Sequence, residues 1–245
     1  MNIGTYYMKR SQLYLYQFIA ASILLLFFYL TDFLHSFAII LYVLWIFLLY
    51  LFVHYLFYEW KVKNSKAGKC TQIKCRQDLL LLLFTQGPLL KMHFFLPNGL
   101  EEMELYQDVS RFNWLVPPII DNWTNRRFFI RDRSGLLIAS IYVSKRQPQI
   151  TLLMKETVLS LQLIRKRHRK LVFIFQKDEI SVEQKYGVMK IKKNDQMMCQ
   201  MQKGWMPISW QRTFAPNTPI LIFSDNASEI DRLICLALIQ YLSHI

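Results

Sequence analysis

Two groups of basic side chains are the residues best suited to chemistry in this sequence, and that chemistry is the binding of anions. The first group is a run of five permanent cations interrupted by one histidine: Arg165, Lys166, Arg167, Arg169 and Lys170. The second group follows Trp123 and contains Arg126, Arg127, Arg131 and Arg133. Guanidinium groups match the geometry of phosphate oxygens. A solvated loop and a solvated strand face are the alternative explanations for the two groups.

The chemistry of these cations narrows the choice of partner. The formal net charge of +13 favours an anionic partner. A cluster of four to eight Lys/Arg attracts anionic lipid, with about 1 kcal/mol per residue, when it lies at a cytoplasmic membrane surface. Nucleic acid is the rival polyanion, but the chain has no aromatic RNA-binding motif. The partners expected are therefore a lipid bilayer and its anionic phospholipids, and nucleic acid is not expected.

Signatures of catalysis and metal binding are absent from the sequence. It contains no G-x-S-x-G elbow, no Walker loop, no H-E-x-x-H and no dinucleotide fingerprint. The cysteines, Cys70, Cys75, Cys199 and Cys235, lack zinc-site spacing, so we expect free structural thiols in a reducing compartment. We expect a protein that is not an enzyme and that has no cofactor and no metal.

The elements that must position the basic groups begin with two apolar segments. Residues 13–30 and 37–57 carry no charge. About 20 apolar residues in a helix cross the hydrocarbon core of a bilayer. A core helix of a soluble protein would not be apolar on every face at this length. Residues 1–60 are therefore predicted to form a two-helix transmembrane hairpin.

The charges around the hairpin predict its orientation. Lys9 and Arg10 precede the first span, and a lysine-rich stretch from Lys61 to Arg76 follows the second. The connecting turn, residues 31–36, has no lysine or arginine. Because basic residues stay inside, the expected location is the cell membrane, with two spans and both termini in the cytoplasm.

After the hairpin, the pattern changes to short alternating runs typical of strands. Residues 61–90 are interpreted as a basic juxtamembrane linker and connecting segment, and residues 91–245 as a β-rich domain. Alternation with period two indicates strands that have one face in a core and one in water. Candidate strands cover residues 91–96, 126–132, 136–143, 149–155, 159–163, 171–176, 179–183, 189–192, 197–202 and 219–223. Alternation in the second of these would place Arg127, Phe129, Arg131 and Arg133 on one face.

The C-terminal segment is predicted to be a buried helix. Residues 225–231 offer helix-capping and acidic residues, and residues 233–239 are apolar on every side of a helix. That run is too short to span a bilayer, so protein must surround it. One sheet can cover only one side of a helix. We therefore predict an antiparallel β-barrel closed around a hydrophobic C-terminal helix.

Two segments resemble a known superfamily. "FFIRDRSGLLIASI", residues 128–141, is similar to the strand, turn and strand unit of the tubby C-terminal-like fold shared with phospholipid scramblases, and "PILIFSDNASEIDRLICLALIQYL", residues 219–242, to its closing strand and core helix. "RFNWLVPPIIDNW", residues 111–123, resembles the aromatic-rich character of the bacterial membrane-anchored type. In animal tubby proteins the fold implies phosphoinositide binding, but no lipid pocket matches residue by residue here.

The expected function combines the anchor with the cations. The first hypothesis is a membrane-anchored, non-enzymatic cytoplasmic domain that binds anionic phospholipid headgroups at the inner leaflet. The expected headgroup-binding residues are Arg165, Lys166, Arg167, Arg169, Lys170, Arg127, Arg131 and Arg133. The alternative is a structural or docking subunit that packs against other membrane proteins, and a weaker alternative is scramblase-like lipid transport.

Overall fold

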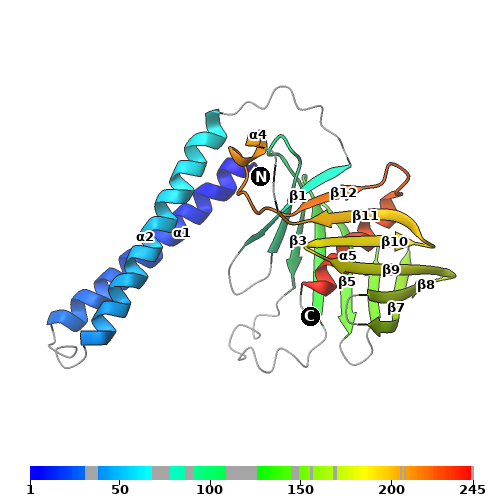
Figure 1. Ribbon diagram of the computed structural model, residues 1–245, viewed down its shortest axis with the longest axis horizontal. Coiled ribbons are helices and arrows are strands. Elements are labelled where there is room, and N and C mark those ends of the chain that lie inside the picture. Colours follow the sequence, from blue (N-terminus) through cyan, green and yellow to red (C-terminus); the bar gives the residue numbers. More distant parts are fainter. Residues whose placement is uncertain are drawn as a thin grey trace. The chain divides into compact units, whose positions relative to one another are not determined.

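The computed structural model of the chain describes residues 1–30, 38–67, 78–85, 91–108, 126–144, 149–154, 157–167, 170–204, 206 and 208–243. The chain divides into two compact units (Figure 1). One is helical and consists of Met1–Thr71 together with Pro207–Ala215. The other consists of Gln72–Met206 and Pro216–Ile245 and holds the strands.

Two long helices form the first unit. α1 (Ile3–Leu30) and α2 (Ala38–Ala67) have 28 and 30 residues, and each contains a segment apolar and long enough to cross a membrane. Only 11% of each apolar window is buried, unlike the core helix of a soluble protein. Ser11 Oγ donates a 2.7 Å hydrogen bond to Glu59, and the rings of Tyr14 and Tyr58 stack 5.4 Å apart. Two membrane-length helices are thus confirmed, whereas the predicted turn lies outside the described residues.

The segment Pro207–Ala215 belongs to this helical unit although it lies between two strands in the sequence. The helix α4 (Ile208–Gln211) forms part of it. Lys61 of α2 is 1% exposed, and its Nζ donates to the carbonyl oxygens of Gln211, at 2.5 Å, and of Phe214, at 2.8 Å. Phe214 is fully buried. Lys61 was expected in a juxtamembrane linker, but it is an internal residue of α2, and its two hydrogen bonds hold the segment Pro207–Ala215.

Twelve antiparallel strands make a closed barrel in the second unit (Figure 1). They are β1 (Leu79–Thr85), β2 (Lys91–Phe95), β3 (Glu101–Gln107), β4 (Arg126–Asp132), β5 (Leu137–Ser144), β6 (Gln149–Leu153), β7 (Val158–Arg167), β8 (Lys170–Phe175), β9 (Asp178–Lys185), β10 (Val188–Lys193), β11 (Gln196–Gln202) and β12 (Ile220–Phe223). Consecutive strands are neighbours, and β1 closes the barrel by pairing with β12. The predicted antiparallel barrel is confirmed. β1 falls within the stretch expected to be a connecting segment, and neither β1 nor β3 was predicted.

The tight turn between β4 and β5 follows from its sequence. Gly135 has φ of +85°, a conformation that glycine adopts without a steric penalty. Asp132 Oδ1 accepts hydrogen bonds from Leu136 N at 2.9 Å and from Ser134 Oγ at 2.6 Å. These bonds reverse the chain within three residues and fix the register of the two strands.

One apolar core fills the β-rich unit. Inward positions alternate with outward ones, as at Phe128 and Ile130 of β4, which are both fully buried. The helix α5 (Glu229–Leu242) contributes residues 233–239 to the same core as the strands. Ser228 and Asp231 form a capping box at its start. The predicted C-terminal helix is therefore present, and the residues in its middle, 233–240, are buried.

Candidate functional site

The outward face of β4 carries two of the predicted arginines. Arg127 and Arg131 are exposed, whereas Phe128 and Ile130 between them are buried in the core. Phe129 shares the outward face and pairs with Tyr106 of β3. The alternation predicted for Arg127, Phe129 and Arg131 is present. It does not extend to Arg133, because β4 ends at Asp132 and the chain turns there.

Aromatic rings of three strands hold these arginines. The guanidinium of Arg131 lies 4.5 Å from the ring centroid of Tyr106. That of Arg127 lies 4.6 Å from the ring of Phe129 and 4.9 Å from the ring of Tyr142 on β5. The rings of Tyr106 and Phe129 are themselves 5.4 Å apart. We call Tyr106, Arg127, Phe129, Arg131 and Tyr142 the arginine–aromatic strip.

The strip can bind anions through its guanidinium edges. An arginine that stacks on an aromatic face still presents its N–H groups in the plane of the guanidinium. Stacking also orders the side chain before a ligand arrives, which lowers the entropic cost of binding. Asp108 lies 3.9 Å from Arg127, and both side chains are more than 40% exposed, so this ion pair is weak. The arrangement suits phosphate, with aromatic rings beside it that tolerate an apolar neighbour.

The basic run Arg165–Lys170 forms a separate group on another part of the sheet. β7 extends beyond the predicted strand, residues 159–163, and continues to Arg167, with an irregular register between Leu163 and Arg165. Arg165 and Lys166 are exposed. Lys170 forms a 3.2 Å ion pair with Glu183 of β9. Arg169 and the side chain of Arg167 lie outside the described residues.

The two predicted basic groups are therefore not one site. β5 and β6 separate β4 from β7 in the barrel. Among the described residues, the arginines of the strip contact aromatic rings on three strands, whereas Arg165 and Lys166 of the basic run contact no aromatic ring. The strip is the more organised of the two groups. Its members on β3 and β5, Tyr106 and Tyr142, could not be assigned from the sequence of β4 alone.

A buried polar chain on β1, β2 and β3 was not found by the sequence analysis. Thr85 Oγ1 lies 2.9 Å from His93 Nε2, and His93 Nδ1 donates to Glu101 at 2.5 Å. Burial is the largest single influence and would raise the pKa of Glu101, but hydrogen bonds and charge interactions, those with His93 among them, together outweigh it and lower that pKa. Alternation along β2, which turns Met92 and Phe94 into the core, would have placed His93 on the outward face.

This polar chain also offers metal-ligating atoms. His93, Glu101 and Glu104 have ligand atoms within 4.8 Å of one another, the one such group among the described residues. The imidazole already bonds to Thr85 and Glu101, and Lys91 Nζ lies 3.4 Å from Glu104. A cation beside the donor set opposes a metal ion. The contacts therefore describe a buried structural network in preference to a metal centre.

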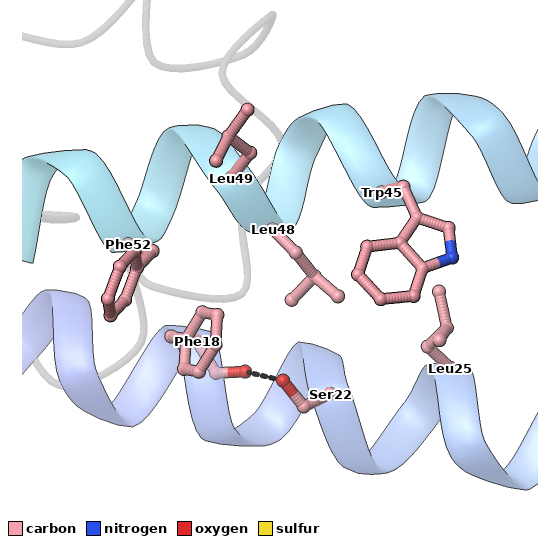
Figure 2. A pocket seen from close by; sticks show the side chains of 7 residues that line it. All are labelled: Phe18, Ser22, Leu25, Trp45, Leu48, Leu49 and Phe52. Carbon is pink, nitrogen blue, oxygen red and sulfur yellow. Dashed lines mark hydrogen bonds between the residues drawn. The ribbon is translucent and has the colours of Figure 1, made fainter.

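The hairpin has an apolar groove of about 370 Å³ (Figure 2). Trp45 and Leu25 lie at one end of the groove and Phe18 and Phe52 at the other, with Leu48, Leu49 and Ser22 between them. Ser22 Oγ donates a 2.8 Å hydrogen bond to the carbonyl oxygen of Phe18, so its polar group is satisfied within α1. The lining contains no charged side chain. Such a groove suits acyl chains or the side chains of a further helix.

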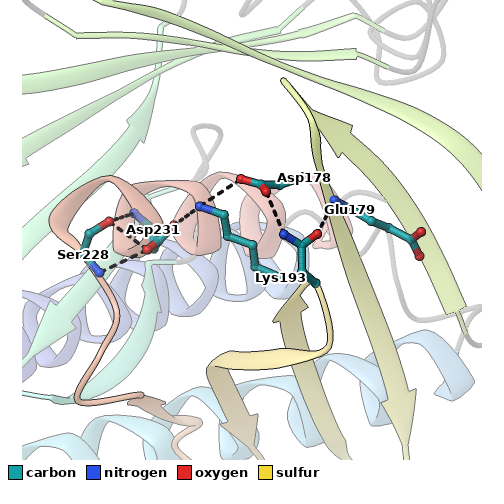
Figure 3. A network of polar contacts seen from close by, with 6 residues as sticks. Asp178, Glu179, Lys193, Ser228 and Asp231 are labelled. Carbon is teal, nitrogen blue, oxygen red and sulfur yellow. Dashed lines mark hydrogen bonds and ion pairs between the residues drawn. The ribbon is translucent and has the colours of Figure 1, made fainter.

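Polar contacts tie the start of α5 to the β9–β10 hairpin (Figure 3). Lys193 Nζ lies 3.2 Å from Asp178 and 3.4 Å from Asp231. Burial alone would lower the pKa of Lys193, but its hydrogen bonds and charge interactions with these two carboxylates outweigh it and raise that pKa. Asn194 donates a 2.7 Å hydrogen bond to Asp178. The network stabilises the fold and leaves no donor set for a ligand.

Two of the four cysteines lie in the core of the β-rich unit. Cys199 of β11 and Cys235 of α5 are free thiols with no exposed surface. Burial, with a hydrogen bond from Cys199, raises the pKa of Cys235 well above its ordinary value. Cys70 and Cys75 lie outside the described residues. The expectation of structural thiols thus fits the two that the structure describes.

No family model, no curated protein and no solved structure matches this chain.

Proposed function

We propose that this protein is a membrane-anchored, non-enzymatic domain whose β-barrel binds anionic phospholipid headgroups at the inner leaflet. The observation that carries the proposal is the arginine–aromatic strip, in which Arg127 and Arg131 are held over aromatic rings. Guanidinium forks bind phosphate oxygens, and aromatic side chains are favoured at the headgroup level of a bilayer. The strip combines both kinds of group on one exposed face.

The anchor in this proposal is the pair α1 and α2. Both are long and apolar enough to span a bilayer. Lys9 and Arg10 lie at the start of α1, and basic residues follow the apolar part of α2, whereas the connecting turn has no lysine or arginine. This asymmetry supports a hairpin with both termini in the cytoplasm. A tethered domain needs little intrinsic affinity to engage the lipid beside it.

The scaffold in this proposal is a barrel closed around α5. Residues 233–239 of the helix are nearly inaccessible and share one core with side chains from the surrounding strands. α5 contacts the neighbouring strands β5 and β6 and also β11, which lies half-way around the barrel from β5. A helix enclosed by twelve strands would resemble the tubby C-terminal-like fold, as the sequence segments suggest. A rigid wall of this kind would hold the strip on β3, β4 and β5 in one geometry.

Binding of soluble short-chain lipids to the full chain tests the proposal. The protein in non-ionic detergent would be titrated calorimetrically with dihexanoyl phosphatidylglycerol and, as the neutral control, dihexanoyl phosphatidylcholine. The full chain is required because residues 207–215, which interrupt the β-rich unit, belong to the helical unit. We expect preferential binding of phosphatidylglycerol.

Three charge-neutralised variants locate the site. Arg127→Gln with Arg131→Gln should weaken phosphatidylglycerol binding by about 2 kcal/mol, roughly thirtyfold in Kd, at about 1 kcal/mol per basic residue. Lys190→Gln with Lys203→Gln is the matched control, because both lysines are exposed and lie outside the strip. Arg165→Gln with Lys166→Gln measures the contribution of the second basic group. Equal binding of the two lipids by the parent protein would refute the proposal.

The docking alternative has one observation in its favour. The groove between α1 and α2 is apolar and open, with the side chain of Trp45 63% exposed, and would accept a helix of another membrane protein. If the parent protein shows no preference for phosphatidylglycerol, a structural or docking subunit becomes the leading explanation. Scramblase-like transport would require lipid exchange between leaflets in reconstituted vesicles as well as binding.

A further inference from the structure

A mixed cavity lies at the end of the barrel where α5 begins. Two adjoining hollows, of about 560 Å³ and about 400 Å³, share Asp132, Ile138, Glu229 and Leu233 in their linings. The walls come from β3, from the β4–β5 turn and the start of β5, and from the first two turns of α5. Cavities of about 300–1,000 Å³ are the size that binds small molecules. All of these residues belong to the β-rich unit.

The floor and one rim of the cavity are apolar. Leu136 is 67% exposed, Leu137 47% and Ile230 41%, and all three line the smaller hollow. Met154 and Leu233 lie deeper in the same lining. Large aliphatic side chains left in water beside a hollow mark a surface that gains free energy when an apolar group covers it. The cavity therefore suits the chain of an amphiphile.

The polar part of the lining is acidic. Glu102, Asp132 and Glu229 contribute carboxylates, and within the described part of the chain none of the three has an ion-pair partner. The hydrogen bond from Ser134 lowers the pKa of Asp132, which keeps that carboxylate ionised. Arg232 also lines the cavity, but its guanidinium is paired with Asp78 at 2.7 Å. The charge of this cavity is thus opposite to that of the protein as a whole.

The acids of the cavity are not arranged for a metal ion. The described residues contain one group of three ligands close enough to hold a metal, and it is formed by His93, Glu101 and Glu104 on other positions of the barrel. Carboxylates spread around an apolar hollow instead suit an organic cation. Its charged group can donate hydrogen bonds to several carboxylates while its chain lies on the apolar floor.

We propose that this cavity binds a single-chain cationic amphiphile, an aliphatic chain that ends in a primary ammonium group. The ammonium lies among the carboxylates of Glu229, Asp132 and Glu102. The chain covers Leu136, Leu137 and Ile230. This site is independent of the arginine–aromatic strip, because its charge excludes the anionic ligands that the strip would take.

Calorimetric titration of the full chain in lipid nanodiscs tests this proposal, with empty nanodiscs as the blank for partitioning. The probes are octylamine, octanol and octanoate, which share one chain length and differ in head charge, together with butylamine, which has the same head and a shorter chain. Saturable binding of octylamine is expected. Octanol, which lacks the charge, and butylamine, which lacks half of the chain, should each bind at least about tenfold more weakly. For octanol, the loss of one charged hydrogen bond is worth about that factor.

Substitutions at one exposed position decide the role of the charge. Glu229→Gln should weaken octylamine binding about tenfold, and Glu229→Lys should shift the preference towards octanoate. Glu179→Gln is the matched control, because this exposed glutamate lies on β9 outside the cavity lining. Unchanged melting of the barrel would show that each variant is folded. Equal binding of octylamine and octanol, or equal effects of Glu229→Gln and Glu179→Gln, would overturn the proposal, and neither result depends on headgroup binding by the strip.

Discussion

At the residue scale, the arrangement of the arginines distinguishes this surface from a solvated basic strand. A lone surface arginine gains little from a nearby carboxylate, as the exposed pair of Arg127 and Asp108 illustrates. Arg127 and Arg131 instead lie over aromatic rings, which restrain both guanidinium groups. The geometry of the cations, and not their number, is the property that we connect with phosphate binding.

Replacement of Arg127 by lysine separates geometry from charge. Arg127→Lys keeps the positive charge but removes the planar group that stacks between Phe129 and Tyr142. We expect phosphatidylglycerol binding to weaken about two- to fivefold, the equivalent of one exposed cation–π contact. Arg133→Lys, at an exposed turn position, is the control and should change nothing. Equal Kd values for both variants and the parent would show that only charge matters.

The buried thiol of Cys235 predicts that the free energy of unfolding falls at alkaline pH. Its pKa is raised well above the ordinary value, chiefly by burial. In the unfolded chain the thiol ionises above about pH 8.5, whereas in the folded chain it keeps its proton. The folded state therefore binds more protons than the unfolded state above this pH, and stability must fall as the pH rises further.

This sign can be checked with Cys235→Ala. The free energy of unfolding of the parent protein should decline above about pH 8.5, and the decline should be shallower in the variant. Tyrosines and lysines titrate in both proteins, so they cancel in the comparison. Denaturant unfolding of the barrel in detergent, followed between neutral and alkaline pH, provides the measurement. Parallel pH profiles would contradict the explanation.

At the element scale, α5 contributes residues 233–239 to the apolar core that it shares with the strands. Leu236 is fully buried within the apolar cluster. Leu236→Asp places a charge there without a partner, which costs several kcal/mol even after relaxation. We expect loss of the cooperative thermal unfolding transition, measured by circular dichroism on the full chain.

The matched control lies on the same helix. Ile230 is 41% exposed, so Ile230→Asp should melt close to the parent protein. If Leu236→Asp also melts like the parent, the helix is not enclosed by the barrel.

Elements with one clear periodicity could be predicted from sequence. The ten expected strands correspond to ten of the twelve observed, and the expected C-terminal helix corresponds to Glu229–Leu242. β1 was not predicted because Leu79–Leu83 is a continuous apolar run, which does not show the alternation of a half-buried strand. β3 escaped because Glu101, Glu102 and Glu104 have low strand propensity, and neighbouring strands supply the pairing that overrides it.

The candidate site was only partly predictable for a related reason. Alternation within β4 sufficed to place Arg127, Phe129 and Arg131 on one face. Tyr106 and Tyr142 come from β3 and β5, and their position beside the arginines depends on strand register. A register is set by turns and core packing along the whole sheet, so no local pattern reveals it. The same applies to the contact between His93 and Glu101.

At the scale of the whole molecule, headgroup binding at the inner leaflet requires the hairpin to lie in a membrane with both termini inside. Ser36→Cys and Ser243→Cys, each made in a chain with Cys70→Ser and Cys75→Ser, compare the connecting turn with the C-terminal end. A membrane-impermeant maleimide added to intact cells should label the first variant at once. It should label the second only after permeabilisation. Labelling of Ser243→Cys in intact cells would invert the topology and remove the barrel from the inner leaflet.

Photo-crosslinking would detect contact between the strip and anionic headgroups directly. The full chain would be placed in nanodiscs containing phosphatidylglycerol with a photoactivatable group on the headgroup, and the labelled peptides would be identified by mass spectrometry. We predict labelling of the peptides that contain Tyr106, Phe129 and Tyr142, and its loss in Arg127→Gln with Arg131→Gln. Labelling should also fall at high salt, because charge attraction is screened beyond about 3 Å at 1 M ionic strength. Labelling of these peptides no stronger than with the corresponding phosphatidylcholine probe would contradict anionic headgroup binding by the strip.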